Sequence, residues 1–139
     1  MAQWTKLRGN EAEAANRGEV SALLIRLGYQ VYRPEADVDG IDLVLRQPFG
    51  ELIDVQLKSR LTVNKPLYGE RNIWMLFPDR PWDANIVRRW FLIPHDKLFG
   101  IIKERHGHAA KWDETWSAAK PARAILPLLE PHRLKNTSA

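Results

Sequence analysis

A chain of 139 residues is long enough for a hydrophobic core, and we expect residues 1–139 to form one domain. The absence of cysteine excludes disulfides and thiolate metal sites, and the apolar runs are too short for a transmembrane helix. The N-terminus lacks the apolar core of a signal peptide, so we expect a soluble cytoplasmic protein without a membrane partner.

The net charge of +4 at pH 7 is distributed unevenly along the chain. Residues 1–57 carry 6 basic and 9 acidic side chains, a net of −3, whereas residues 58–139 carry 15 and 8, a net of +7. A basic half beside an acidic cluster suits a protein that holds a polyanion near a metal ion. A mildly basic surface also occurs in proteins that bind no nucleic acid.

Residues 10–27 are predicted to form a helix, because Asn10 can cap its start and Gly28 suits the position just past its end. An apolar stripe at helical spacing runs along it: Ala15, Ala22, Leu23 and Leu27. Glu19 lies on this stripe, where a carboxylate is costly unless it has a partner. A metal ion or a water network would be such a partner. Solvent or an arginine at the edge of the stripe would be another.

Alternating apolar and polar residues predict two strands within residues 41–58, joined by a turn at Gln47–Gly50. Gln56 and Lys58 share one strand face, because side chains two apart point the same way. If the strands pair as a hairpin, Asp42 lies near both. A carboxylate, an amide oxygen and an ammonium at one place suit a magnesium site that activates water. The alternative is an amphipathic hairpin with a solvated polar face.

Other carboxylates close to this hairpin compete for the role of metal ligand. Asp54 shares the strand face two residues before Gln56 and could substitute for it. The loop before Asp42 carries three further acids: Glu35, Asp37 and Asp39. We prefer Asp42, because a strand fixes the position of its side chains better than a loop does.

Three more strands and one helix are predicted: strands at residues 29–33, 72–77 and 88–94, and a helix from 95 to about 102. Basic side chains that follow the hairpin are candidates for DNA phosphate contacts, with simple solvation as the alternative: Arg60, Lys65 and Arg71. The core is expected over about residues 10–105. Residues 106–139 form a basic extension in which Trp112 and Trp116, four apart, could share a helical face.

The order of these parts resembles the PD-(D/E)XK nuclease superfamily. The matching parts are a helix with Glu19, then G-I-D-L-V-L with Asp42, a turn, and I-D-V-Q-L-K-S with Gln56 and Lys58. The segment is most similar to the Holliday-junction-resolvase and restriction-endonuclease branches, and the resemblance covers about residues 10–60. It implies an α/β fold with a restriction-endonuclease-like α/β/α core around a central mixed β-sheet.

The resemblance also implies roles for individual residues. Asp42 would bind Mg²⁺, or Mn²⁺ in its place, together with Gln56 and the backbone carbonyl of Leu57. Lys58 would assist the attacking water, and Glu19 would complete the metal shell. The partner would be DNA, and the protein would act as a homodimer or larger homo-oligomer.

Gln56 departs from the family pattern, which usually has Glu or Asp at this place, although some branches carry Q-x-K and remain nucleases. The amide removes one negative charge, which predicts weaker metal binding or greater dependence on Glu19. Two functions therefore follow: a Mg²⁺-dependent DNA endonuclease, and a catalytically inactive DNA-binding module with a nuclease fold. A structural or small-molecule-binding α/β domain is a third hypothesis.

Overall fold

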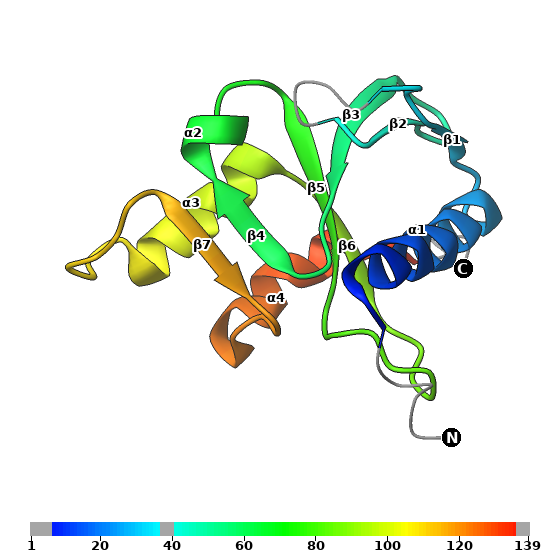
Figure 1. The fold of residues 1–139 in the computed structure, drawn as a ribbon. Helices are drawn as coiled ribbons and strands as arrows, with labels where there is room; N and C mark the ends of the chain where they lie inside the picture. Colours follow the sequence, from blue (N-terminus) through cyan, green and yellow to red (C-terminus); the bar gives the residue numbers. More distant parts are fainter. Residues whose placement is uncertain (1–6, 37–40, 136–139) are drawn as a thin grey trace.

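The structure is a computed structural model that describes residues 7–36 and 41–135. Helices and strands are interspersed along this part of the chain (Figure 1). In chain order they are α1 (Gly9–Arg26), β1 (Gln30–Tyr32), β2 (Leu43–Arg46), β3 (Leu52–Leu57), β4 (Leu61–Asn64), α2 (Lys65–Tyr68), β5 (Ile73–Pro78), β6 (Trp90–Pro94), α3 (His95–His106), β7 (Thr115–Ala118), η2 (Arg123–Ile125), α4 (Leu126–Leu129) and η3 (Glu130–His132).

A five-stranded mixed sheet in the order β1-β2-β3-β5-β6 forms the centre of the fold. β3 and β5 run parallel, and the other neighbouring strands are antiparallel. Parallel neighbours need a crossover connection, which β4 and α2 supply here. β4 pairs antiparallel with β7 in a separate two-stranded sheet, which Figure 1 shows beside α3.

Two apolar clusters lie on opposite faces of the central sheet. Val20 and Leu24 of α1 pack with one set of strand residues, including the fully buried Leu43 of β2. Leu98 and Ile102 of α3 pack with the other set. The predicted α/β fold with helices on both faces of a central mixed sheet is therefore confirmed. Among the described residues, no helix is long and apolar enough to span a membrane.

Helix α1 presents to the sheet a stripe that agrees only in part with the one predicted. Its buried residues are Asn16, Val20 and Leu24, whereas Ala22 is exposed. The predicted Leu23 and Leu27 are partly buried and pack against the same cluster, so the prediction holds for the C-terminal half of the stripe. At the end of the helix, Gly28 has φ +94°, a conformation that favours glycine, as expected past a helix terminus.

The second half of the chain contains elements that the sequence pattern did not reveal. Residues 61–68 form β4 and α2, for which no element was predicted, and Trp116 lies in strand β7 rather than on a helix. The C-terminal segment also contributes to the core, because Ile125 and Leu129 are buried against α3 and the sheet. Residues after 106 are thus part of the packing of the domain.

A buried histidine connects β4 to α3. His95 is 1% exposed, and its Nε2 accepts a hydrogen bond of 3.0 Å from the Asn64 backbone N–H. Its Nδ1 lies 3.0 Å from an Asp96 oxygen, and this hydrogen bond lowers the pKa of Asp96. The imidazole also contacts the Tyr68 ring edge-on, with centroids 5.7 Å apart. The histidine therefore holds Tyr68 of α2 in place.

Candidate functional site

A cavity of about 600 Å³ lies where β3 ends, beside the start of α1. Four of the residues predicted for the site line it: Asp42, Gln56, Leu57 and Lys58. The N-terminal half of α1 forms the facing wall and contributes Glu13 and Asn16, among others. The hairpin therefore brings the predicted polar groups together, as the strand alternation indicated.

Asp42 is fixed to the neighbouring strand β3 through backbone and side chain. Its N–H donates to the Val55 carbonyl at 2.9 Å, and its Oδ2 accepts from the Leu57 N–H at 3.0 Å. The register pairs Val44 with Asp54, so alternation places the Asp42 side chain on the same face as Gln56. In a β-strand the backbone N–H and C=O of one residue point toward the same neighbouring strand. Because the Leu57 N–H points toward Asp42, the Leu57 carbonyl points to the same side of β3.

Gln56 is buried on the cavity wall with only 9% of its surface exposed. Its Oε1 is buried and has no hydrogen-bond partner among the described residues. An unsatisfied buried acceptor costs about 1–3 kcal/mol, so an oxygen in this position favours a water or a cation as its partner. This observation supplies the second oxygen that a metal site next to Asp42 requires.

Lys58 follows β3 directly, and its N–H donates to the Leu76 carbonyl at 2.9 Å, which continues the ladder to β5. Its Nζ lies 5.5 Å from the centroid of the Tyr68 ring, a cation–π contact. Because His95 holds Tyr68, the ammonium has a defined support at the cavity. The site thus combines two side-chain oxygens from the hairpin with an ammonium beside an aromatic ring.

The donor set fits a hard cation that keeps several waters. Among residues 7–36 and 41–135, no group of three or more His, Cys, Asp or Glu side chains could hold a metal ion. What the cavity offers instead is a carboxylate, an amide oxygen and a backbone carbonyl, from Asp42, Gln56 and Leu57. Mg²⁺ binds through one or two carboxylates and completes its octahedron with water, so these oxygens suit it.

Glu19 does not line this cavity. Its two carboxylate oxygens accept hydrogen bonds of 2.8 and 3.2 Å from the Arg88 guanidinium. The indole N–H of Trp90 donates a further bond of 2.6 Å to the same carboxylate. Of the two partners considered for a carboxylate on this helix face, the structure therefore shows the arginine.

The helix residues that do line the cavity were missed from the sequence. Glu13 and Arg17 both lie there and form an ion pair of 2.9 Å across one helical turn. Asn16, which stands between these two residues in the sequence, also lines the cavity and is only 4% exposed. A signal for Asn16 did exist, since it stands four residues before the apolar Val20 and eight before Leu24.

The remaining acids near the hairpin are less well placed. Asp54 is half-buried on β3, the strand of Gln56, but does not line the cavity, and Glu35 is exposed. Asp37 and Asp39 lie outside the described residues.

All three candidates for DNA phosphate contacts are exposed, and none lines the cavity: Arg60, Lys65 and Arg71. Lys65 already has two partners, because its Nζ lies 3.7 Å from a Glu114 oxygen and 5.7 Å from the centroid of the Phe99 ring. Contacts to DNA by Lys65 would therefore compete with an existing ion pair.

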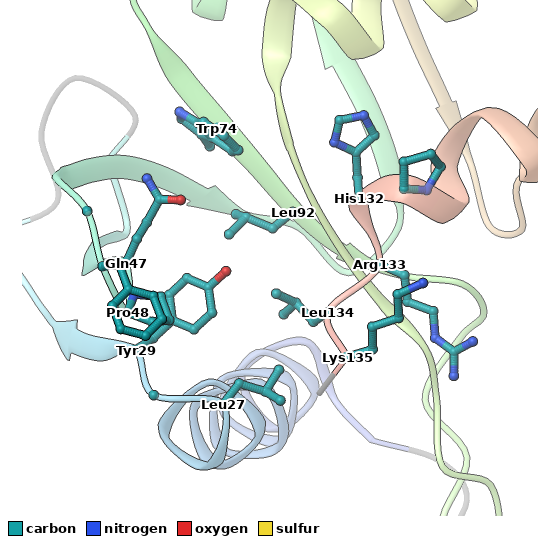
Figure 2. Close-up of a pocket in the computed structure, with 14 residues that line it drawn as sticks. Leu27, Tyr29, Gln47, Pro48, Trp74, Leu92, His132, Arg133, Leu134 and Lys135 are labelled. Carbon is teal, nitrogen blue, oxygen red and sulfur yellow. The ribbon is translucent and has the colours of Figure 1, made fainter. Parts of the chain in front are cut away.

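A second, larger cavity of about 1010 Å³ lies at the other end of α1 (Figure 2). Tyr29 and the β2–β3 turn form one wall, and residues 132–135 form the opposite wall. Burial raises the pKa of the Tyr29 hydroxyl. None of the residues predicted for the metal site lines this cavity.

The fold is similar to that of a solved structure, the bacterial homing endonuclease I-Ssp6803I. The likeness has a TM-score of 0.57 at 14% sequence identity, and it covers 92% of this chain and 88% of the endonuclease. No protein-family profile and no curated protein matches the sequence. At this identity the likeness establishes the fold: the chain has the mixed α/β architecture of an endonuclease.

Proposed function

We propose that the protein is a Mg²⁺-dependent DNA endonuclease of the PD-(D/E)XK type with a Q-x-K motif, which hydrolyses phosphodiester bonds. The observation that carries the proposal is the buried Gln56 Oε1 without a partner among the described residues, in one cavity with Asp42 and Lys58. The endonuclease-like fold supports the same reaction class.

In this proposal Asp42, Gln56 and the Leu57 carbonyl hold Mg²⁺, or Mn²⁺ in its place. The bound cation would neutralise charge on the phosphate and lower the pKa of a bound water. Lys58 donates from its ammonium to the attacking water and orients it toward the phosphorus. Arg60, Lys65 and Arg71 contact phosphates of the flanking DNA.

The decisive experiment is cleavage of supercoiled plasmid and of branched DNA by the purified protein. We expect nicking with Mg²⁺ or Mn²⁺ and none in EDTA, together with a rise in the unfolding temperature on addition of either ion. Gln56 specifically favours one other function, the inactive DNA-binding module. That function would be supported by DNA binding that persists in EDTA, with no cleavage and no metal-dependent stabilisation under any divalent ion.

Replacing Lys58 by Met should reduce cleavage about 100-fold, because the ammonium that orients the water is lost. The unbranched thioether side chain keeps most of the apolar contact with Tyr68, so the fold should be preserved. The metal-dependent shift in unfolding temperature should remain, since Lys58 is not a ligand. Single-turnover cleavage of a labelled duplex measures the first effect, and thermal unfolding measures the second.

Lys65→Met provides the matched control, because Lys65 also places its ammonium near an aromatic ring but lies outside the cavity. It should alter DNA affinity at most, with the single-turnover rate at saturating DNA unchanged. Equal rates for Lys58→Met and the wild type would remove Lys58 from the proposed mechanism.

The proposal includes assembly into a homodimer through the face that carries the larger cavity (Figure 2). Phe49 at the tip of the β2–β3 turn is fully exposed and lies at the rim of this cavity. Glu51 lies two residues after Phe49, whereas the opposite wall of the cavity carries Arg133 and Lys135. A two-fold axis would place the β2–β3 turn of each copy against residues 132–135 of the other copy. Phe49 would then pack on apolar side chains, and Glu51 would lie near Arg133 and Lys135.

Phe49→Ser should therefore weaken self-association at least about tenfold without lowering the stability of the isolated chain, since Phe49 packs on nothing within it. Sedimentation velocity over a concentration series measures the dissociation constant. Val87→Ser is the control, because Val87 is 97% exposed on a different loop and should leave association unchanged. A wild-type chain that stays monomeric at 100 times the assay concentration would contradict this part of the proposal.

A further inference from the structure

An ion pair between a buried arginine and a partly exposed glutamate joins the β5–β6 loop to α1 next to the candidate site. The Arg88 side chain is 1% exposed and binds both oxygens of Glu19. It also donates to the Asn16 Oδ1 at 2.7 Å and to the Arg80 carbonyl at 3.3 Å. The plane of the Trp90 ring supports the guanidinium, 5.0 Å from its centroid. The guanidinium is thereby fixed on several sides.

Asn16 is the point at which this network reaches the cavity. Its side chain is nine-tenths buried, yet it lines the cavity together with Asp42, Gln56 and Lys58. Because the Oδ1 accepts from Arg88, the orientation of the amide plane is set, and the Nδ2 is turned away from Arg88. An amide nitrogen carries two N–H donors, and donors of this kind suit an anionic oxygen.

We infer that Asn16 donates a hydrogen bond to a phosphate oxygen of the DNA strand in the cavity, and that Arg88, fixed by Glu19, positions Asn16 for this contact. The inference rests on the proposed nuclease function. Asn16 is then a substrate-contacting residue, whereas Arg88 and Glu19 act through it. Glu19, which the sequence suggested as a metal ligand, thus serves in this arrangement to fix Arg88 and thereby to orient the Asn16 amide.

Asn16→Ala tests the contact. It should lower kcat/KM at least about tenfold, since a hydrogen bond to a charged oxygen is lost. The affinity for a DNA duplex in Ca²⁺, under conditions without cleavage, should fall by a similar factor. Val20→Ala is the control for a looser α1, because Val20 is buried one turn further along and does not line the cavity. At a temperature where both variants are fully folded, Val20→Ala should cut like the wild type.

Arg88→Met tests the positioning role through a double-mutant cycle with Asn16→Ala. Alone, Arg88→Met should lower kcat/KM several-fold, because the amide is free to rotate. In the Asn16→Ala background it should have no further effect on folded protein. Effects that multiply independently would show that Arg88 does not act through Asn16. If Arg88→Met does not fold, Arg88→Lys takes its place in the cycle.

Two results separate this inference from the function on which it rests. Wild-type kcat/KM for Asn16→Ala, alongside loss of cleavage in Asp42→Asn, would overturn the inference and leave the nuclease function standing. Absence of metal-dependent cleavage by the wild-type protein would overturn the nuclease function itself.

Discussion

Asp42→Asn should abolish metal-dependent cleavage, with a loss of about 1,000-fold or more. The substitution removes the negative charge that the cavity directs at the cation, yet the amide oxygen can still accept the hydrogen bond from the Leu57 N–H. The fold should therefore remain intact while the metal site is lost. The measurement is single-turnover cleavage of a plasmid with Mg²⁺, with circular dichroism to verify folding.

The same variant should lose the stabilisation that the wild type gains from Mg²⁺. A ligand at 100 times its dissociation constant raises the free energy of unfolding by about 2.7 kcal/mol, which thermal unfolding readily detects. Asp54→Asn is the matched control, since Asp54 lies on the neighbouring strand β3, two residues before Gln56, but does not line the cavity. It should retain both cleavage and the metal-dependent shift. If Asp54→Asn loses cleavage and Asp42→Asn keeps it, Asp54 is the metal ligand.

Glu19→Gln should lower the free energy of unfolding by about 3 kcal/mol, with or without metal. The Arg88 side chain is 1% exposed, so removing the charge of Glu19 leaves a buried cation without its counterion. For a chain of this length, such a loss corresponds to a fall in unfolding temperature of roughly 10 °C. Denaturant titration and thermal unfolding in EDTA measure both quantities.

A metal ligand at this position would behave differently. Its loss would leave stability in EDTA unchanged and reduce only the stabilisation by Mg²⁺. Glu13→Gln is the control on the same helix, because Glu13 pairs with Arg17 at an exposed position and should cost less than about 0.5 kcal/mol. Equal stability of Glu19→Gln and the wild type in EDTA would contradict the assignment of Glu19 to the ion pair with Arg88.

Strand alternation predicted the hairpin because it depends only on neighbours in the sequence. The register pairs Val44 with Asp54, and this local pairing is sufficient to bring Asp42 beside Gln56. The approach of Lys58 to the cavity follows from the same period of two. The fold class was predicted from the resemblance of this order of elements to the PD-(D/E)XK nuclease superfamily.

The environment of Glu19 could not be predicted by such local reasoning. Its partners Arg88 and Trp90 lie 69 and 71 residues away in the sequence, and only the packing of β6 against α1 brings them together. β4 and β7 were missed for a related reason, because each is four residues long and pairs across more than 50 residues of chain. Short strands of this kind are specified by their tertiary partner rather than by their own pattern.

The pairing of β4 with β7 limits how the protein can be shortened. A fragment that ended at residue 105 would keep every group of the candidate metal site, yet it would strip the strand that pairs with Leu61 and Val63. It would also uncover the apolar surface that Ile125 and Leu129 now protect from water. A fragment that keeps this packing therefore has to extend through α4, well beyond the segment from Asp42 to Lys58.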